Sequence, residues 1–545
     1  KPRPGNPAYY FRDLTFGSAR GLKWKVWFGP NTLPRAAISA TSKPNRPPES
    51  RVKRKGPSVL LVLFTVVLIR VVLTAQSSQG QPVNSTQLMA WLTAGVPANR
   101  LVRIVQERGI ANVPGKELIR QLEAAGADAN LIHTLKNLKR FAAADSSASE
   151  IPMVLVQAAT DARAQRFHEA EIALRQAIIA DPQNAALHFA LGTMLRQQEL
   201  WDDAIDEITL SAQLMPDFPE NHSSLAYIFY RLDDPSDSIA EARTALSMDP
   251  QNAEAYQFLG LAFFSDGQYG ASANAFAESL ARDADNPDTY YDLGITLHAD
   301  GNLPAAIAAY RHAIGLNSRF WQAHSNLALI LHEQNKLDEA IAEYREAKKL
   351  APEEASVRNN LGNTYCDKGD FDGAIRELRE LYRQHPEWEQ GHGCLARAYM
   401  AKKDYASAVS ELELAVRENP TGSAEHRVLG EALLLDDKLD ESVRELRLAV
   451  ALNPDSDAAH HVLGTALFQQ HQLQAAEKEF REALRLNASP DNHYALAACL
   501  MTMNRYEEAL SELETAARLD PERQLYRARR DELLKLMQMK DTTSR

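Results

Sequence analysis

Cysteine is scarce in this chain of 545 residues. The sequence contains three, Cys366, Cys394 and Cys499, and no two of them stand close together along the chain. Such an odd and sparse set excludes a disulfide framework, and its spacing matches no metal-binding motif. We therefore expect all three to be free thiols that serve as small apolar side chains.

The short motifs that mark common enzyme sites are also lacking. Gly115-Lys116 stands alone rather than within a phosphate-binding Walker loop, and HExxH, CxxC, GxSxG and the dinucleotide fingerprint are absent. Each motif would supply a nucleophile, a metal ligand or an anion cradle at fixed spacing. Their absence favours a protein that is not an enzyme, and we predict no catalytic residue, no cofactor and no metal site.

Positive charge is concentrated near the N-terminus. Residues 1–57 carry thirteen Lys and Arg against Asp13 and Glu49, a net charge of +11, and because the whole chain is at −12 the remainder sums to −23. A nucleic-acid clamp needs a basic stripe, so the acidic body argues against nucleic acid as a partner. A solvated acidic surface is the simpler interpretation.

What the sequence does contain is a period of 34 residues. Helix-ending positions, most of them proline, recur at this spacing and come one residue early at the last step: Pro182, Pro216, Pro250, Ala284, Ser318, Pro352, Pro386, Pro420, Pro454, Ala488 and Pro521. A fixed period of this size indicates stacked repeats. Eleven repeats fit between residues 151 and 522, and the first covers residues 151–184.

Every repeat has the same arrangement of small and large side chains. Position 7 is leucine almost throughout, position 8 is Gly or Ala, positions 20 and 27 are small, and position 24 is usually large. Positions 4, 7, 8 and 11 share one stripe of a first helix, and positions 20, 24 and 27 share one stripe of a second. The small residues let two helix backbones approach, so the pattern predicts an all-α fold of helix hairpins.

This pattern resembles the tetratricopeptide repeat (TPR) family, whose Leu, Gly/Ala, Ala and Pro positions are matched by Leu191, Gly192, Ala204 and Pro216. The resemblance implies a right-handed α-solenoid of about eleven hairpins with a concave groove that binds peptides or helices. Residues 523–545 are expected to form a capping helix and tail, because an open stack must cover its last apolar face.

In TPR proteins, positions 2, 5, 9, 12 and 13 of the first helix line the groove. The resemblance therefore implies a partner-binding surface that runs from aromatic residues to amides and arginines, with two amides at position 6: Phe189, Tyr227, Tyr230, Phe264, Tyr291, Asn326, Asn359, Asn360, Asn363, Arg397 and Arg427. Such a surface can take apolar side chains and hydrogen-bond a peptide backbone or carboxylate. Alternatively, the aromatic residues only pack on adjacent repeats. The family's basic carboxylate clamp is not reproduced, because Asn359 stands in place of lysine.

Histidine occupies position 4 in seven repeats, as His188, His222, His324, His392, His426, His460 and His493. Equivalent helices of a stack lie roughly 8–10 Å apart, whereas ligands must lie about 2 Å from a shared metal ion, so we expect no metal there. The histidines replace half-buried aromatic residues. Because charging a half-buried imidazole is costly, we expect protonation near pH 5–6 to loosen the stack.

The residues before the repeats have the composition of an export signal. A basic run at residues 51–55 precedes an apolar stretch that ends near Ala75, and we expect residues 58–75 to be the signal, with the repeats periplasmic or secreted. The alternative is an inner-membrane anchor that extends through Arg70 and leaves the repeats outside the cytoplasm. Residues 1–57 are expected to be a basic, disordered leader; alternatively, translation begins near Val52 and residues 1–50 are an artefact of the gene model.

Residues 76–150 predict a separate four-helix domain followed by a linker. Helical apolar spacing covers residues 86–93, 99–108, 116–124 and 129–140, and Ser85 and Asp128 are the expected N-caps.

Together these features predict an exported, non-catalytic scaffold that binds a protein or peptide partner in the groove. Two alternatives stay open, namely a regulatory or substrate-presenting subunit of a separately encoded envelope enzyme, and a component of envelope assembly. The identity of the partner and the oligomeric state do not follow from the sequence.

Overall fold

The computed structural model describes residues 11–14, 24–27, 82–111, 114–137 and 151–543. It consists of two compact units, residues 1–319 and 320–545, and each is described by itself. The expected signal at residues 58–75 and the linker at residues 138–150 lie outside the described residues. Among the described residues, no helix is both long and apolar enough to cross a membrane.

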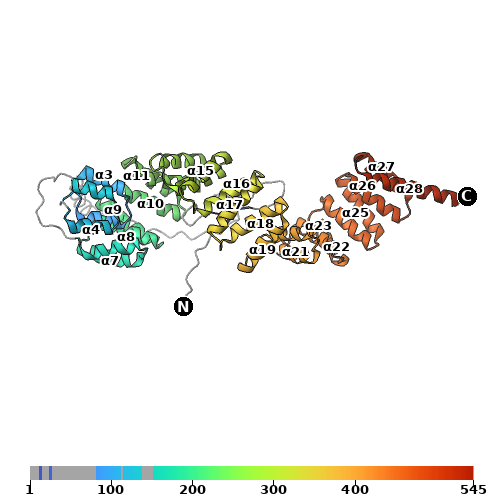
Figure 1. The fold of residues 1–545 in the computed structure, drawn as a ribbon, viewed down its shortest axis with the longest axis horizontal. Helices are drawn as coiled ribbons and strands as arrows, with labels where there is room; N and C mark the ends of the chain where they lie inside the picture. The colour runs from blue at the N-terminus through green and yellow to red at the C-terminus, as the bar shows by residue number, and fades with distance from the viewer. Residues whose placement is uncertain (1–10, 15–23, 28–81, 112–113, 138–150, 544–545) are drawn as a thin grey trace, which may run out of the picture. The chain divides into compact units, whose positions relative to one another are not determined.

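Eleven helix hairpins follow one another along residues 153–519 (Figure 1). In the first unit they are α6 (Met153–Arg163), α7 (Phe167–Ala180), α8 (Ala185–Gln197), α9 (Trp201–Leu214), α10 (Pro219–Arg231), α11 (Pro235–Met248), α12 (Ala253–Ser265), α13 (Tyr269–Leu280), α14 (Pro287–Ala299) and α15 (Leu303–Leu316). In the second they are α16 (Trp321–Glu333), α17 (Leu337–Leu350), α18 (Ala355–Lys368), α19 (Phe371–Gln384), α20 (His392–Ala401), α21 (Tyr405–Glu418), α22 (Ser423–Leu435), α23 (Leu439–Leu452), α24 (Asp457–Gln469), α25 (Leu473–Leu486), α26 (Pro490–Thr502) and α27 (Tyr506–Leu519). The predicted succession of paired helices is confirmed.

Position 8 is the point where the two helices of a hairpin touch. A Cβ atom on Gly192 would lie 2.5 Å from the side chain of Ile208, and one on Gly294 would lie 2.6 Å from the ring of Tyr310. Where position 20 is serine, its hydroxyl donates to the carbonyl of position 8, as Ser238 does to Ala226 at 2.7 Å. Small residues at these positions therefore set the close approach of the helices, as the pattern predicts.

The turn within each hairpin has one residue in the left-handed conformation, always at the same place in the repeat. The first ten lie at position 15 and the last comes one residue early: Gln165, Glu199, Asp233, Gly267, Gly301, Asn335, Gly369, Lys403, Asp437, His471 and Asn504. Glycine adopts this conformation without strain, whereas other residues pay a steric cost. Only three of the eleven positions are glycine, so composition alone does not reveal the turn.

Four helices precede the repeats: α2 (Ser85–Thr93), α3 (Ala98–Arg108), α4 (Lys116–Ala124) and α5 (Ala129–Asn137). Asn84 rather than Ser85 caps α2, because its side chain accepts from the N–H of Gln87. Asp128 accepts from the N–H of Leu131, as expected of an N-cap.

This four-helix segment is not a separate domain. Helix α2 packs on α6 and α8, and its buried side chains share one apolar core with the first repeats. The indole of Trp91 stacks on the ring of Phe218 with centroids 5.3 Å apart. The prediction of a separate domain is wrong, because the apolar side chains of α2 are buried against the first repeats instead of forming a core of their own.

At the other end of the chain, α28 (Gln524–Thr543) packs on α27. Tyr526 and Leu533 of α28 are fully buried. The expected capping helix is therefore present in the second unit.

Two short strands lie in the N-terminal leader. β1 (Phe11–Leu14) pairs antiparallel with β2 (Trp24–Trp27), and Phe11 stands opposite Trp27. These residues are rich in aromatic and β-branched types, which favour strands. The other residues of the leader lie outside the described part of the chain, so its expected disorder stays a prediction.

Candidate partner-binding groove

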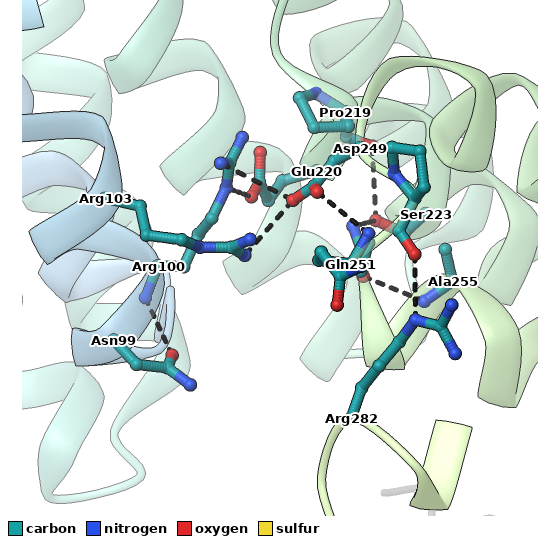
Figure 2. A network of polar contacts seen from close by, with 12 residues as sticks. Asn99, Arg100, Arg103, Pro219, Glu220, Ser223, Asp249, Gln251, Ala255 and Arg282 are labelled. Carbon is teal, nitrogen blue, oxygen red and sulfur yellow. Dashed lines mark hydrogen bonds and ion pairs between the residues drawn. The ribbon is translucent and has the colours of Figure 1, made fainter. Parts of the chain in front are cut away.

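The first part of the expected groove is covered by the chain itself. Phe189, on α8, is buried and packs edge-on against Phe218 at 5.2 Å, and Trp91 of α2 stacks on the same ring. Helix α3 adds three ion pairs with the third repeat, from Arg100 to Glu220 at 2.5 Å and to Asp249 at 3.5 Å, and from Arg103 to Asp249 at 3.1 Å (Figure 2). Phe189 is thus a core residue beneath the N-terminal helices.

Three further aromatic residues of the predicted surface also lie within the repeats. Tyr230, Phe264 and Tyr291 are buried, and Tyr291 packs on Tyr310 with centroids 5.9 Å apart. Phe264 packs on Tyr269 at 5.2 Å across its own hairpin. These three residues therefore pack against adjacent side chains of the repeats, as the alternative interpretation of the sequence expected.

Tyr227, on α10, is the predicted aromatic residue that borders an open space. It lines a cavity of about 280 Å³ that is shared by the first helices of four consecutive repeats, α8, α10, α12 and α14. We call this space the Asp292 cavity, and define it by Arg196, Tyr227, Arg231, Gln257, Asp288 and Asp292. Its residues occupy the first-helix positions that the resemblance assigns to the groove, together with position 6.

One wall of the Asp292 cavity is basic. The guanidinium groups of Arg196 and Arg231 lie 5.1 Å and 5.8 Å from the centre of the Tyr227 ring. Arg231 also donates to the Tyr227 hydroxyl at 2.8 Å and pairs with Glu199 at 2.9 Å. These contacts fix the orientation of the tyrosine ring.

The other wall is acidic. Asp292 is 1% exposed, and its Oδ1 atom has no hydrogen-bond partner among the described residues. Its Oδ2 atom accepts only a long bond of 3.4 Å from Gln257. Burial therefore raises the pKa of Asp292 well above its usual range, and the negative charge of Asp288 adds to this effect. Neither carboxylate belongs to the set predicted from sequence, in which position 6 was represented only by asparagines.

The amides of the predicted surface lie in the second unit and are buried. Asn326, Asn359, Asn360 and Asn363 are all less than a tenth exposed. The Oδ1 atoms of Asn359 and Asn363 have no hydrogen-bond partner among the described residues. The structure thus leaves acceptor capacity on α18, at positions 5 and 9 of the seventh repeat.

The two predicted arginines differ in their surroundings. Arg397 pairs with Asp367 at 2.6 Å, and Asp367 also accepts from His332 at 3.0 Å. Burial opposes ionisation of Asp367, but these two hydrogen bonds hold its pKa below the usual value. Arg427 instead lines a second cavity of about 520 Å³, which lies between α22, α24 and α26 and includes His461 and Tyr494.

The histidines at position 4 each face a glutamate that lies 19 residues further along the chain, with Nδ1 2.5–2.7 Å from the carboxylate: Glu207, Glu241, Glu343, Glu411, Glu445, Glu479 and Glu512. No group of His, Cys, Asp and Glu able to hold a metal occurs within the described part of the chain. The row is therefore a set of polar contacts within the hairpins.

The expectation that protonation loosens the stack is wrong for His188. Hydrogen bonding to Glu207 raises the pKa of His188 although burial opposes the shift. The charged imidazole is thus favoured in the folded state, because it has an acidic partner that an aromatic substitute would lack.

All three cysteines are buried free thiols, as predicted. Cys366 and Cys394, 28 residues apart in sequence, come together between α18 and α20, where the Cys366 thiol donates to the Cys394 carbonyl at 3.3 Å. Arg397 donates to the Cys366 sulfur at 3.1 Å.

Solved structures similar to this chain are repeat proteins of limited identity. MamA from Desulfovibrio magneticus RS-1 is 18% identical over 31% of this chain and 95% of its own, with a TM-score of 0.30. YrrB, described as a TPR protein with an unusual peptide-binding site, is 22% identical over 36% of this chain and 97% of its own, with a TM-score of 0.31. Yeast Tom70 is 15% identical over 72% and 96%, with a TM-score of 0.29.

A search of curated protein sequences finds no match. Family comparisons match the tetratricopeptide repeat at residues 155–217, 224–288, 291–355 and 395–457, and a second tetratricopeptide repeat group at residues 331–398. Residues 445–516 match subunit 3 of the anaphase-promoting complex, cyclosome. The tetratricopeptide matches together span more than half of the chain and coincide with the hairpins α6–α23, so the chain belongs to the tetratricopeptide repeat family.

Proposed function

We propose that this protein is a non-catalytic scaffold that binds an extended segment of a protein or peptide partner along its first helices. Repeats of this family generally mediate protein or peptide binding. The observation that carries the proposal is the Asp292 cavity, which four consecutive first helices share and which combines an aromatic ring with both basic and acidic groups. Convergent polar groups around an apolar surface are typical of binding sites.

The covered part of the groove supports the same function. Helices α2 and α3 already lie on the first repeats, where they bury Trp91 and form ion pairs through Arg100 and Arg103. The surface of the first helices thus already binds a helical segment of the same chain through apolar and basic side chains. A partner would bind beyond this segment, from the third repeat onward.

The substitution Tyr227→Ala tests the proposal. The full chain with this substitution should no longer capture the partner that the wild-type chain captures from a cell-envelope extract. Loss of a central aromatic contact should weaken the affinity for this partner about tenfold or more. Tyr230 is left intact, because it is only 2% exposed and its truncation would open a cavity in the core.

Tyr256→Ala is the matched control. Tyr256 is also a first-helix tyrosine beneath an arginine, with Arg282 4.2 Å from its ring centre, but it lies at position 4 and does not line the cavity. Binding should survive this change. Equal loss of binding in both variants, or undiminished binding in Tyr227→Ala with an unchanged melting temperature, would refute the groove assignment.

Export is the second part of the proposal and is supported by the basic run at residues 51–55 and the apolar residues 58–69. Residues 1–81 fused to alkaline phosphatase should give enzyme activity in a bacterial host, because this enzyme matures only outside the cytoplasm. Fusion activity should disappear when the apolar residues are deleted. Activity that depends on neither segment would contradict export by this signal.

A further inference from the structure

Acidic residues recur at position 2 of three consecutive repeats in the first unit. They are Glu220, Glu254 and Asp288, and each lies in the first turn of its helix, on α10, α12 and α14. The first of them is already neutralised, because Glu220 pairs with Arg100 of α3, and the neighbouring Asp249 pairs with Arg103 (Figure 2). The contacts of α3 thus show that these carboxylates can bind basic side chains of a helix that packs on the repeats.

The other two acidic residues of the row form no such ion pair, although the charge of Arg196 acts on Glu254. Glu254 and Asp288 are exposed, and neither forms an ion pair with a described residue. They lie in the next two repeats along the groove, on α12 and α14. The row therefore continues past the segment that covers its beginning.

Asp292 provides the independent observation. It lies one turn after Asp288 on α14, is 1% exposed and lines the Asp292 cavity with its Oδ1 atom unpartnered among the described residues. A buried carboxylate without a partner is costly to the fold. Neither arginine of the cavity pairs with Asp292. Arg231 is paired with Glu199 and Tyr227, and Arg196 lies over the Tyr227 ring, where its charge acts on Glu254.

The size of the cavity limits what can fill it. Sites for drug-sized ligands usually measure about 300–1,000 Å³, whereas this cavity measures about 280 Å³. It suits one long side chain better than a whole small molecule. The aliphatic part of such a side chain would lie against Phe258 and Leu261, which also line the space.

We infer that the Asp292 cavity binds a Lys or Arg side chain of the partner peptide, with the cation against Asp292 and Asp288. This specificity rests on the proposed function, because it identifies one residue class within the segment that the groove binds. The peptide would continue along the row of carboxylates from Glu220, which Arg100 of α3 already contacts.

The test compares the full wild-type chain with its Asp292→Asn variant on an array of synthetic decapeptides of random sequence. Asparagine is already present at this position of the repeat as Asn326 and Asn360, so the variant should fold. Asp206→Asn is the control, because it makes the same charge change at an exposed residue of the second helix α9.

Wild type and control should retain peptides enriched in Lys or Arg, and Asp292→Asn should bind those peptides at least tenfold more weakly while its melting temperature stays the same or rises. Retained peptides without any basic preference, or a preference equal in all three proteins, would overturn the inference but leave peptide binding intact. If the wild-type chain retains no peptide at all, both the inference and the proposed function fail.

Discussion

His188 forms a polar contact at each ring nitrogen. Its Nδ1 lies 2.6 Å from a carboxylate oxygen of Glu207, and its Nε2 lies 3.1 Å from the carbonyl oxygen of Pro182. Both oxygens can only accept, so both nitrogens donate when the ring is doubly protonated. His426 and His460 repeat this geometry with Pro420 and Pro454. These three histidines thus link their hairpins to the end of the hairpin before.

This geometry sets the sign of the pH dependence. Because the pKa of His188 is raised in the folded state, its contribution is fully present below its ordinary pKa of 6.5 and is lost as the pH rises through the folded value. The melting temperature should therefore rise when the pH is lowered from 8.5 to 6. His188→Gln should remove about 1 kcal/mol of this difference.

The partner provides the control for this prediction. Glu207→Gln should flatten the pH dependence as much as His188→Gln does, and the double variant should show no further change, because both act on one contact. Thermal unfolding followed by circular dichroism at the two pH values measures the effect. Variants that keep the wild-type dependence, or a melting temperature that falls on acidification, would contradict it.

Helix contact at position 8 leads to a second prediction at the residue scale. Gly294→Ala would place a methyl group 2.6 Å from the fully buried ring of Tyr310 and should destabilise the fold by about 1–3 kcal/mol. Gly315→Ala on α15 meets nothing within 4 Å and should stabilise by up to about 1 kcal/mol. Urea unfolding measures the change in the free energy of unfolding for each variant. Opposite signs would separate overpacking at Gly294 from a general effect of alanine, and the same sign for both would refute the overpacking.

At the scale of elements, the left-handed turn residue decides how well each hairpin closes. Lys403 adopts a φ of 61° between α20 and α21, where glycine is found in three other repeats. Lys403→Gly should stabilise the protein by about 0.5–1 kcal/mol, because the strain exceeds the extra entropy of unfolded glycine. Gly369→Ala should have the opposite effect, and the melting temperatures of the two variants check both. A destabilised Lys403→Gly would show that the turn is not strained.

The helices could be predicted from the sequence because every repeat has the same pattern of small and large side chains. Leu191 and Gly192, read with their equivalents 34 residues on, identify a buried stripe that a single hairpin would leave ambiguous. The contact of Trp91 with Phe218 has no such repetition, since it joins distant parts of the chain once only. The burial of Phe189 beneath α2 therefore could not be predicted from position 5 alone.

Most residues of the predicted groove are buried, and two of them border open space. Tyr227 and Arg427 both line cavities, as residues at positions 9 and 5 should. Asp292 was not identifiable, because position 6 is buried in most repeats and a lone acid there carries no periodic signal. Only the surrounding side chains show that its Oδ1 atom is left without a bond.

At the scale of the whole molecule, each hairpin packs mainly on its neighbours within its own unit, so the chain should not unfold in one step. Leu513→Ala, at a fully buried position of α27, should cost about 2–5 kcal/mol and speed amide exchange only near α26–α28. Trp91→Ala should speed exchange near α2–α8 instead. Hydrogen exchange read by mass spectrometry distinguishes these regions. Faster exchange spread evenly over the chain in either variant would indicate a single cooperative unit.

The pairing of His188 with Glu207 joins positions 4 and 23 of one repeat, and six other repeats contain the same pair. A stretch of 34 codons therefore encodes both partners together. When unequal recombination duplicates or deletes one such stretch, the imidazole and its carboxylate are gained or lost as a set. The gene can thus gain or lose whole repeats without leaving a buried imidazole without its carboxylate. Each such step adds or removes one first helix of the partner-binding surface.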